Sequence, residues 1–176
     1  MSRRSEGGVQ LPSAVQALLL GQDHEIIRSE RAVTVQSPGG TGALRIAGDF
    51  LSRHFPSARL WLSQPTWANH PKIFQSARIE VQPYPYFDSS NNGLDFSSMI
   101  EALATVPAGD VVLLHGCCHN PTGVDPTADQ WEEIADIAHK AGWLPLVDFD
   151  YQGFGDGIEE DAAGLRALCL SLIHIS

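Results

Sequence analysis

The chain has 176 residues, of which 43% are hydrophobic, so it is long enough to bury the core of one domain of ordinary size. Eleven basic and 21 acidic residues give a net charge of -10, which repels phosphate backbones and anionic bilayers, so we expect no nucleic-acid and no membrane partner. Apolar stretches fall short of the ~20 residues of a membrane helix, no secretory signal is visible, and three cysteines, two of them adjacent, favour a reducing compartment, so the expected location is cytoplasmic.

Short apolar or β-branched runs alternate along the chain with segments of helical periodicity. This alternation is typical of βαβ units and predicts an α/β fold with a mostly parallel sheet. The first periodic segment begins at the turn Gly39-Gly-Thr-Gly42. Its apolar positions at three-and-four spacing are Leu44, Ala47, Gly48, Leu51 and Phe55. The predicted strands are Ala32–Gln36, Arg59–Ser63, Arg78–Gln82, Val111–His115 and Leu144–Phe149.

Two further segments have clear local signals. Pro83–Leu94, which is rich in Pro, Tyr, Ser, Asn and Gly, predicts a surface loop with a turn at Asn92-Gly93. Asp125–Gly142 predicts a helix, because Thr127 with Gln130 fits a capping box and Gly142 can end the helix. The apolar face of that helix comprises Trp131, Ile134, Ala135 and Ala138.

Two of these features could form part of a ligand-binding site. The Gly39-Gly-Thr turn meets a predicted helix, whose backbone N–H groups and positive end could bind a dianion. Asp148 follows a predicted parallel strand, the place where open α/β sheets bind their ligands. Taken alone, each has an ordinary explanation, since most Gly-rich turns are only turns and most such Asp residues form caps or turns.

Four segments in sequence order resemble the cofactor-binding core of the aspartate and aromatic amino acid aminotransferases. These are class I, fold-type I enzymes that use pyridoxal 5'-phosphate (PLP), and the resemblance extends from about Leu11 to Leu168. The four segments are Gly39-Gly-Thr-Gly-Ala-Leu44, Gln64-Pro-Thr-Trp-Ala-Asn-His70, His115-Gly-Cys-Cys-His-Asn-Pro-Thr-Gly-Val-Asp-Pro126 and Leu146-Val-Asp-Phe-Asp-Tyr-Gln-Gly-Phe154.

The resemblance implies the three-layer large domain of the PLP transferases, present here as an incomplete fragment. Residues 11–169 would be part of that PLP-binding domain, and residues 1–10 an uncertain or truncated N-terminal segment. Residues 170–176 correspond to the translation of a transposase mosaic end used in sequencing libraries. We therefore expect a non-native tail after about Cys169.

The resemblance also assigns roles to individual residues. Asp148 would keep the pyridine nitrogen of PLP charged, and Trp67 would stack on the ring, which makes these two the catalytic candidates. Asn120 and Tyr151 would hydrogen-bond the phenolic oxygen, and Trp67 and Asn120 would also contact substrate. The remaining candidates are Gly39, Gly40 and Thr41 for the phosphate, and His70 and His115 behind the site, with His70 orienting Asp148.

This sequence departs from the family pattern at two points. Asp150 stands where many relatives carry a small residue such as Ala. The Ser-x-Ser-Lys segment, whose lysine forms the Schiff base with PLP, has no counterpart, since Lys72 and Lys140 are the only lysines and neither has surroundings that would depress its pKa. The resemblance also implies two substrate-carboxylate arginines and a second phosphate-binding arginine, which lie beyond this sequence.

The implied function of the parent protein is transfer of an amino group between aspartate or an aromatic amino acid and 2-oxoglutarate, in a homodimer, with amino and 2-oxo acids as partners. This chain alone is expected to be inactive. The alternatives are a non-catalytic PLP-binding or assembly protein derived from the family, and an unrelated doubly wound domain that binds another phosphate ligand.

A metal site is a further alternative, because His115, Cys117, Cys118 and His119 form a cluster of zinc-ligand types. Adjacent cysteines on an extended strand point to opposite faces, so they would not easily share a metal. We therefore expect no metal and interpret the cluster as a buried strand end.

Overall fold

The computed structural model describes residues 7–173, with side chains from Leu11 to Leu170. The predicted segments at the two ends lie partly outside this range, namely residues 1–6 and residues 174–176. None of the helices within residues 7–173 is long and apolar enough to cross a membrane. The helices are α1 Gly7–Leu20, α2 Glu25–Arg28, α3 Gly39–His54, α4 His70–Ser76, α5 Phe96–Ala104, α6 Ala128–Ala141 and α7 Ala163–Ile173, and the strands are β1 Leu60–Gln64, β2 Val81–Pro85, β3 Phe87–Asp88, β4 Gly93–Leu94, β5 Val111–His115 and β6 Leu144–Asp148.

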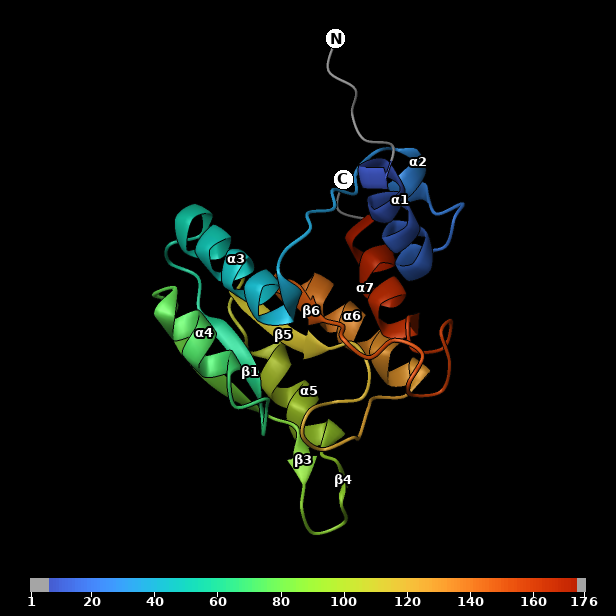
Figure 1. The fold of residues 1–176 in the computed structure, drawn as a ribbon. Coiled ribbons are helices and arrows are strands. Elements are labelled where there is room, and N and C mark those ends of the chain that lie inside the picture. Colours follow the sequence, from blue (N-terminus) through green and yellow to red (C-terminus); the bar gives the residue numbers. More distant parts are fainter. Residues whose placement is uncertain (1–6, 174–176) are drawn as a thin grey trace.

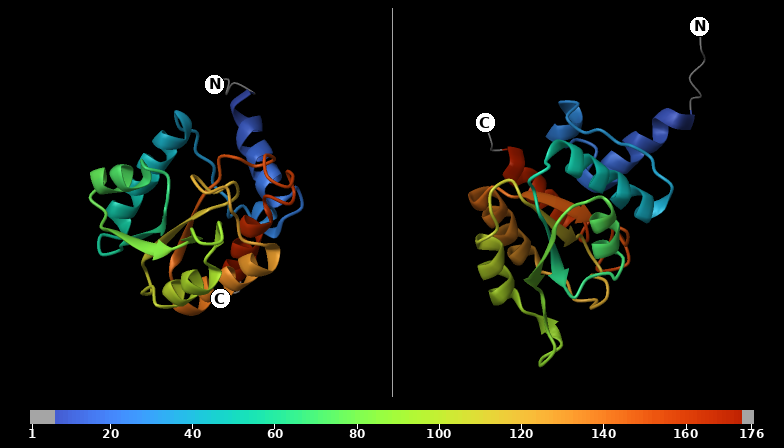
Figure 2. Two further views of the ribbon diagram at one scale, coloured as in Figure 1. Left: turned by 90° about the horizontal axis from the view of Figure 1, so that it is seen from below. Right: turned by 90° about the vertical axis from the view of Figure 1, so that its left-hand side faces the viewer.

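A four-stranded parallel sheet forms the centre of the molecule, in the order β2-β1-β5-β6. Helices α3 and α4 lie on one face of the sheet and α5 and α6 on the other, as the ribbon shows from three directions (Figures 1 and 2). The predicted α/β fold with a parallel, incomplete sheet is therefore confirmed.

The two faces of β5 explain the layers. Val111 and Leu113 pack with α3 and α4, whereas Val112 and Leu114 pack with α5 and α6. Because side chains alternate along a strand, a strand covered on both faces must be apolar throughout, and this made its predicted bounds correct. At the start of the sheet, buried Asp110 accepts hydrogen bonds from the Arg59 N–H and the Trp61 indole, which ties β1 to β5.

Helix α6 follows its sequence signals closely. The Thr127 hydroxyl accepts the Gln130 N–H at 3.3 Å, and the Gln130 side chain accepts the Thr127 N–H at 2.9 Å, which completes the capping box. Gly142 ends the helix at φ 78°, a conformation that costs glycine little.

The prediction for α3 was right except at its last position. Leu44, Gly48 and Leu51 are buried as expected. A β-carbon at Gly48 would lie 3.0 Å from Ala77 Cβ, so glycine permits α3 to approach α4 closely. Phe55 lies beyond the helix and is 45% exposed, so its assignment to the buried face was wrong.

The predicted strand Ala32–Gln36 is also wrong, because residues 7–173 offer it no strand to pair with. Val33 is 86% and Val35 73% exposed, and the Gln16 amide donates to Ala32 O and Thr34 Oγ1. A strand needs a ladder partner, and β-branched residues alone do not supply one.

The predicted strand Arg78–Gln82 begins three residues too early, because helix α4 ends in a tight turn. Arg78 has φ 64° and its N–H bonds Gln75 O, so β2 begins only at Val81 and continues to Pro85. Proline is tolerated there because β2 is an edge strand of the described sheet. The predicted loop 83–94 is thus partly wrong, since it holds the end of β2 and a small hairpin, β3–β4. The predicted turn at Asn92 is present, with φ 53°.

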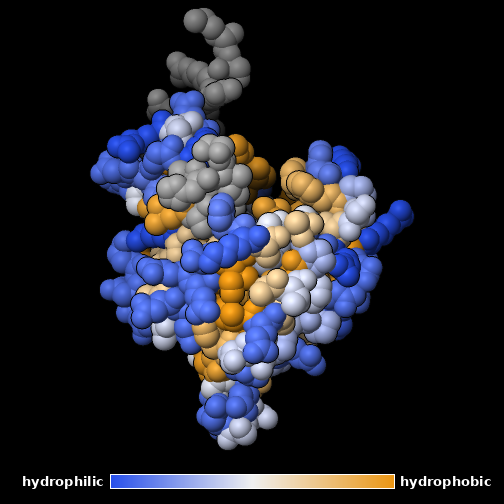
Figure 3. Space-filling model, turned by 180° about the vertical axis from the view of Figure 1, so that it is seen from behind, coloured by the Kyte–Doolittle hydropathy of each residue, from blue (hydrophilic) through white to orange (hydrophobic). Residues whose placement is uncertain are grey.

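At the opposite edge, β6 ends one residue before the predicted Phe149 and pairs, within the described range, with β5 alone. An apolar hollow of about 420 Å³ lies between α3 and β6. Apolar surface also shows as a band on the rear of the molecule (Figure 3). The hollow is lined by Val35, Ser37, Ala43, Ile46, Ala47, Phe50, Leu51, Val111, Leu144, Pro145 and Leu146.

Candidate functional site

The carboxyl ends of the parallel strands meet at one pocket. His115 ends β5 and Asp148 ends β6, and the two residues are paired in the sheet register. The pocket has a volume of about 120 Å³. It is lined by Trp67, His115, Cys117, Asn120, Asp148, Asp150 and Tyr151, so five of the sequence-predicted site residues lie together.

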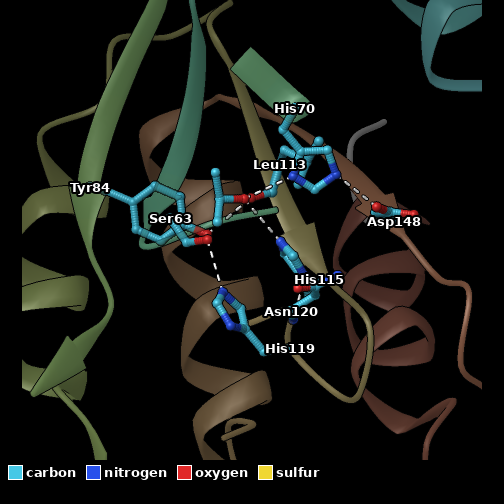
Figure 4. Close-up of polar contacts among 9 residues, drawn as sticks. Ser63, His70, Tyr84, Leu113, His115, His119, Asn120 and Asp148 are labelled. Atoms are coloured by element: carbon cyan, nitrogen blue, oxygen red, sulfur yellow. Dashed lines mark hydrogen bonds and ion pairs between the residues drawn. The ribbon is translucent and has the colours of Figure 1, made fainter. Parts of the chain in front are cut away.

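Helix α4 places a buried histidine against Asp148. His70, which is fully buried at the start of α4, holds Asp148 Oδ2 at 2.8 Å through Nε2. Its other nitrogen lies 2.8 Å from Thr66 Oγ1, and that hydroxyl lies 3.2 Å from His115 Nε2. Figure 4 shows His70 beside Asp148, with a dashed line for the contact between them. The Trp67 ring meets His70 edge-on at 5.3 Å between centroids.

A single backbone group sets the direction of these hydrogen bonds. The Asn120 N–H donates to His115 Nδ1 at 3.2 Å, so a neutral His115 carries its hydrogen on Nε2 and donates to Thr66. The Thr66 hydroxyl is then free to donate to His70 Nδ1, and His70 donates from Nε2 to Asp148. The chain of hydrogen bonds therefore points toward the Asp148 carboxylate.

Burial keeps His115 neutral. Burial and the neighbouring His70 lower the pKa of His115 to about 4, against a smaller raising effect from Asp148. His119 lies beside His115, with 4.2 Å between ring centroids, and burial lowers the pKa of His119 to about 3. The Tyr86 ring stacks on His119 at 3.9 Å, and Ser63 Oγ lies 2.9 Å from its Nε2. Both imidazoles are thus uncharged at neutral pH.

The predicted phosphate-binding residues lie at the start of α3, beside the pocket. Gly39 has φ 74°, and the preceding Pro38 makes no side-chain cap hydrogen bond to the first turn of α3. A β-carbon at Gly40 would lie 3.2 Å from Asp150 Oδ2, which places this turn against the pocket wall. Gly39 and Thr41 are exposed and do not line the pocket.

Sequence reasoning missed three polar residues around this pocket. Thr66 bridges His70 and His115, and this bridge joins a loop, a helix and a strand, so spacing in the sequence did not reveal it. Ser63 and His119 form a second buried pair, which joins strand β1 to the loop after β5 and had no sequence signal. Asp150 stood out in the sequence, but its place in the pocket wall did not.

The expected extended conformation of Cys117 and Cys118 is wrong. Strand β5 ends at His115 and Cys118 has φ 50°, so Cys117 and Cys118 do not lie on an extended strand. Burial raises the pKa of Cys117 to about 12 and also raises that of Cys118, so neither thiol is activated. Within residues 7–173, no three His, Cys, Asp or Glu side chains are grouped so that they could hold a metal ion.

Comparison with known proteins assigns the family. The sequence model for aminotransferases of class I and II matches residues 4–172. The chain belongs to this family. The alternative of an unrelated doubly wound domain is therefore excluded.

Individual aminotransferases agree with the assignment. The Escherichia coli K12 aspartate aminotransferase is 52% identical over 162 residues, which are 92% of this chain and 41% of that protein. The aromatic-amino-acid aminotransferase of the same strain is 47% identical over 155 residues, 88% of this chain and 39% of that protein. The chain thus spans about two fifths of the length of these relatives.

Solved aminotransferase structures share the fold. The aromatic-amino-acid aminotransferase of Burkholderia pseudomallei superposes with a TM-score of 0.89 at 44% identity, over 91% of this chain and 40% of that one. That structure is described as covalently bound to pyridoxal phosphate.

The residues at the pocket fit the ring of this cofactor. An indole (Trp67), a phenol (Tyr151), an amide (Asn120) and a carboxylate held by a histidine (Asp148) are the groups that an aromatic cation with a phenolic oxygen requires. The uncapped start of α3 suits a phosphate, whereas the negative charge of the nearby Asp150 disfavours one.

Proposed function

We propose that this chain is the cofactor-binding part of a PLP-dependent enzyme that transfers an amino group between aspartate or an aromatic amino acid and 2-oxoglutarate. The observation that carries the proposal is the Asp148 carboxylate, which faces the pocket at the end of β6 while His70 holds it from behind. The aspartate and aromatic aminotransferases among the relatives support the choice of substrates.

Asp148 accepts the pyridinium N–H of the cofactor in this proposal. Bound PLP supplies an electron sink that stabilises negative charge at the substrate carbon, and its nitrogen must stay protonated for this. A carboxylate beside the nitrogen favours the protonated form. His70 and, through Thr66, His115 keep the carboxylate in place, so we treat these histidines as positioning residues.

The other pocket residues bind and orient. Trp67 offers an aromatic face to the ring and also borders the substrate, while Asn120 and Tyr151 donate hydrogen bonds to the phenolic oxygen. Gly39, Gly40 and Thr41 hold the phosphate through backbone N–H groups, the Thr hydroxyl and the positive end of α3.

This chain alone does not transaminate in our proposal. Lys72 is exposed on α4, Lys140 is exposed on α6 beside Asp136, and neither lines the pocket, so no amine is placed to attach the cofactor covalently or to move a proton at the substrate. The parent protein would be a cytoplasmic homodimer. The alternative is a non-catalytic PLP-binding or assembly protein derived from this family.

Equilibrium dialysis with PLP tests the cofactor site. We expect the chain to bind PLP in preference to AMP, and Asp148→Asn to weaken PLP binding about tenfold, because a charge-assisted hydrogen bond is lost. Asp136→Asn on α6 makes the same charge change outside the pocket and should leave binding unchanged. Equal binding of PLP and AMP, or an effect of Asp136→Asn as large as that of Asp148→Asn, would refute the site.

Two further measurements separate the parent enzyme from the alternative. Turnover of aspartate with 2-oxoglutarate well above that of free PLP would contradict the proposed inactivity of the chain. Sequencing the source gene past the codon for Cys169 shows whether the parent protein contains the Schiff-base lysine. A reading frame that continues into a Ser-x-Ser-Lys segment supports the aminotransferase, and a stop directly after Ser176 supports the non-catalytic protein.

A further inference from the structure

A carboxylate without a partner occupies the phosphate side of the pocket. Asp150 comes two residues after β6 and its carboxylate reaches back to the first turn of α3. A β-carbon at Gly40 would lie 3.2 Å from its Oδ2 and 3.3 Å from its Oδ1. Among the described residues no hydrogen bond or ion pair holds this carboxylate, whereas Asp148 is held by His70. Asp150 is therefore the pocket carboxylate that nothing neutralises.

The rest of the pocket wall supplies no balancing cation. The seven lining residues include two carboxylates and, within the described range, neither lysine nor arginine. The remaining titratable nitrogen in the wall belongs to His115, which burial keeps neutral. Within the described residues, attraction for an anion at this place thus comes from the backbone N–H groups, the Thr41 hydroxyl and the positive end of α3.

A phosphate held by the first turn of α3 would lie beside Asp150. Two like charges a few ångströms apart repel each other, and because Asp150 is exposed, water and salt screen part of this repulsion. The helix end contributes about half an elementary charge, so one full negative charge is enough to offset it. The charge of Asp150 therefore opposes the binding of a phosphate at these N–H groups.

We propose that Asp150 sets the affinity of this pocket for the phosphate of its cofactor, by placing a negative charge against Gly40 where that phosphate binds. This inference rests on the proposed PLP site. The charge of Asp150 lowers the affinity of the pocket for a phosphorylated ring and leaves its affinity for the same ring without phosphate unchanged. A substitution that removes the charge is then expected to improve cofactor binding, which is unusual for a polar residue in a binding pocket.

Charge and size can be separated with two variants. Asp150→Asn keeps the shape of the side chain and removes the charge, whereas Asp150→Ala also opens space beside Gly40. Asp136→Asn on α6 is the control for net charge, because its exposed side chain lies outside the pocket. Circular dichroism of each variant checks that the fold is retained.

Equilibrium dialysis with PLP and with pyridoxal, which lacks the phosphate, measures the effect without any assay of activity. Asp150→Asn should bind PLP about tenfold more tightly than the unchanged chain and should bind pyridoxal with the same affinity. Asp150→Ala should bind PLP at least as tightly as Asp150→Asn, and Asp136→Asn should change neither affinity. The gain for Asp150→Asn should shrink as salt is raised, since it is electrostatic.

The outcomes distinguish this inference from the proposed function. Unchanged or weaker PLP binding by both Asp150 variants, with PLP still bound, overturns the role of Asp150 and leaves the cofactor site intact. A gain for pyridoxal as large as that for PLP also overturns it, because the effect would not depend on the phosphate. If neither the unchanged chain nor any variant binds PLP, the proposed function fails and this inference fails with it.

Discussion

Replacement of Asp110 should loosen the junction between β1 and β5. Its side chain is 7% exposed and accepts the Arg59 N–H at 3.0 Å, Arg59 Nε at 3.0 Å and the Trp61 indole N–H at 2.9 Å. Arg59 Nη2 lies 2.9 Å from the same carboxylate. Both strands carry the loops of the pocket at their other ends, so this junction supports the site.

The size of the effect follows from these contacts. In Asp110→Ala the Arg59 N–H and the Trp61 indole each lose an acceptor, which costs about 1–1.5 kcal/mol apiece when the donor is sheltered from water. The guanidinium of Arg59 is 35% exposed, so water replaces much of its ion pair and this contributes less than about 1 kcal/mol. We expect Asp110→Ala to lower the free energy of unfolding by about 3 kcal/mol in total.

The effect should depend on pH. Burial raises the pKa of Asp110, but the Arg59 N–H, the Trp61 indole and the Arg59 guanidinium together outweigh it and lower that pKa below its usual 3.8. A lowered folded-state pKa stabilises the protein above the unfolded value, and this contribution is lost as the pH falls through the folded value. The difference in stability between the unchanged chain and Asp110→Asn should therefore narrow below about pH 4.

Urea unfolding followed by circular dichroism at about pH 7 and pH 3 measures both effects. Asp136→Asn, which alters an exposed carboxylate of α6, is the control and should match the unchanged chain. A loss below about 1 kcal/mol for Asp110→Ala, or an Asp110→Asn difference that stays constant down to pH 3, would refute the reasoning.

Three other substitutions test the local structure. Gly116→Ala would place a β-carbon 2.2 Å from Phe149 Cδ2, so we expect overpacking to cost about 2 kcal/mol or more in urea unfolding, and an unchanged midpoint would contradict this contact. Thr127→Ala removes the capping box of α6 and should cost about 1 kcal/mol, while Thr127→Ser should cost little; equal losses would show that the hydroxyl is not the cap. Thr66→Val breaks the link between His70 and His115, so the imidazole ¹⁵N shifts of both should move, whereas Thr66→Ser should keep them near their original values.

The sequence predicted elements that depend on local signals or on burial of both faces. β5 is apolar at Val111–Leu114 because helices cover both sides, and α6 carries its own start and stop signals. Ala32–Gln36 shows the limit, since its β-branched pattern resembles a strand but the described residues offer no neighbouring strand. The local sequence pattern therefore predicted helices better than it predicted the pairing of strands.

The same limit applies to the site. Trp67, Asn120, Asp148 and Tyr151 come together as the order of motifs predicted, because the carboxyl ends of parallel strands share one edge. The position of Thr66 between two histidines depends on side chains from a loop, a helix and a strand, so it could not be derived from spacing. Asp150 lies close to Gly40 although the two residues are 110 positions apart, and this nearness was equally hidden.

The row of hydrogen bonds behind Asp148 begins at a group that cannot change its role. The Asn120 amide can only donate, so a neutral His115 keeps its hydrogen on Nε2 while that bond is kept. The Thr66 hydroxyl can accept from both histidines, so this backbone amide fixes only the inner end of the row. The row is thus a line of dipoles anchored at its far end by the main chain, and its last donor, His70, steadies the charge of Asp148.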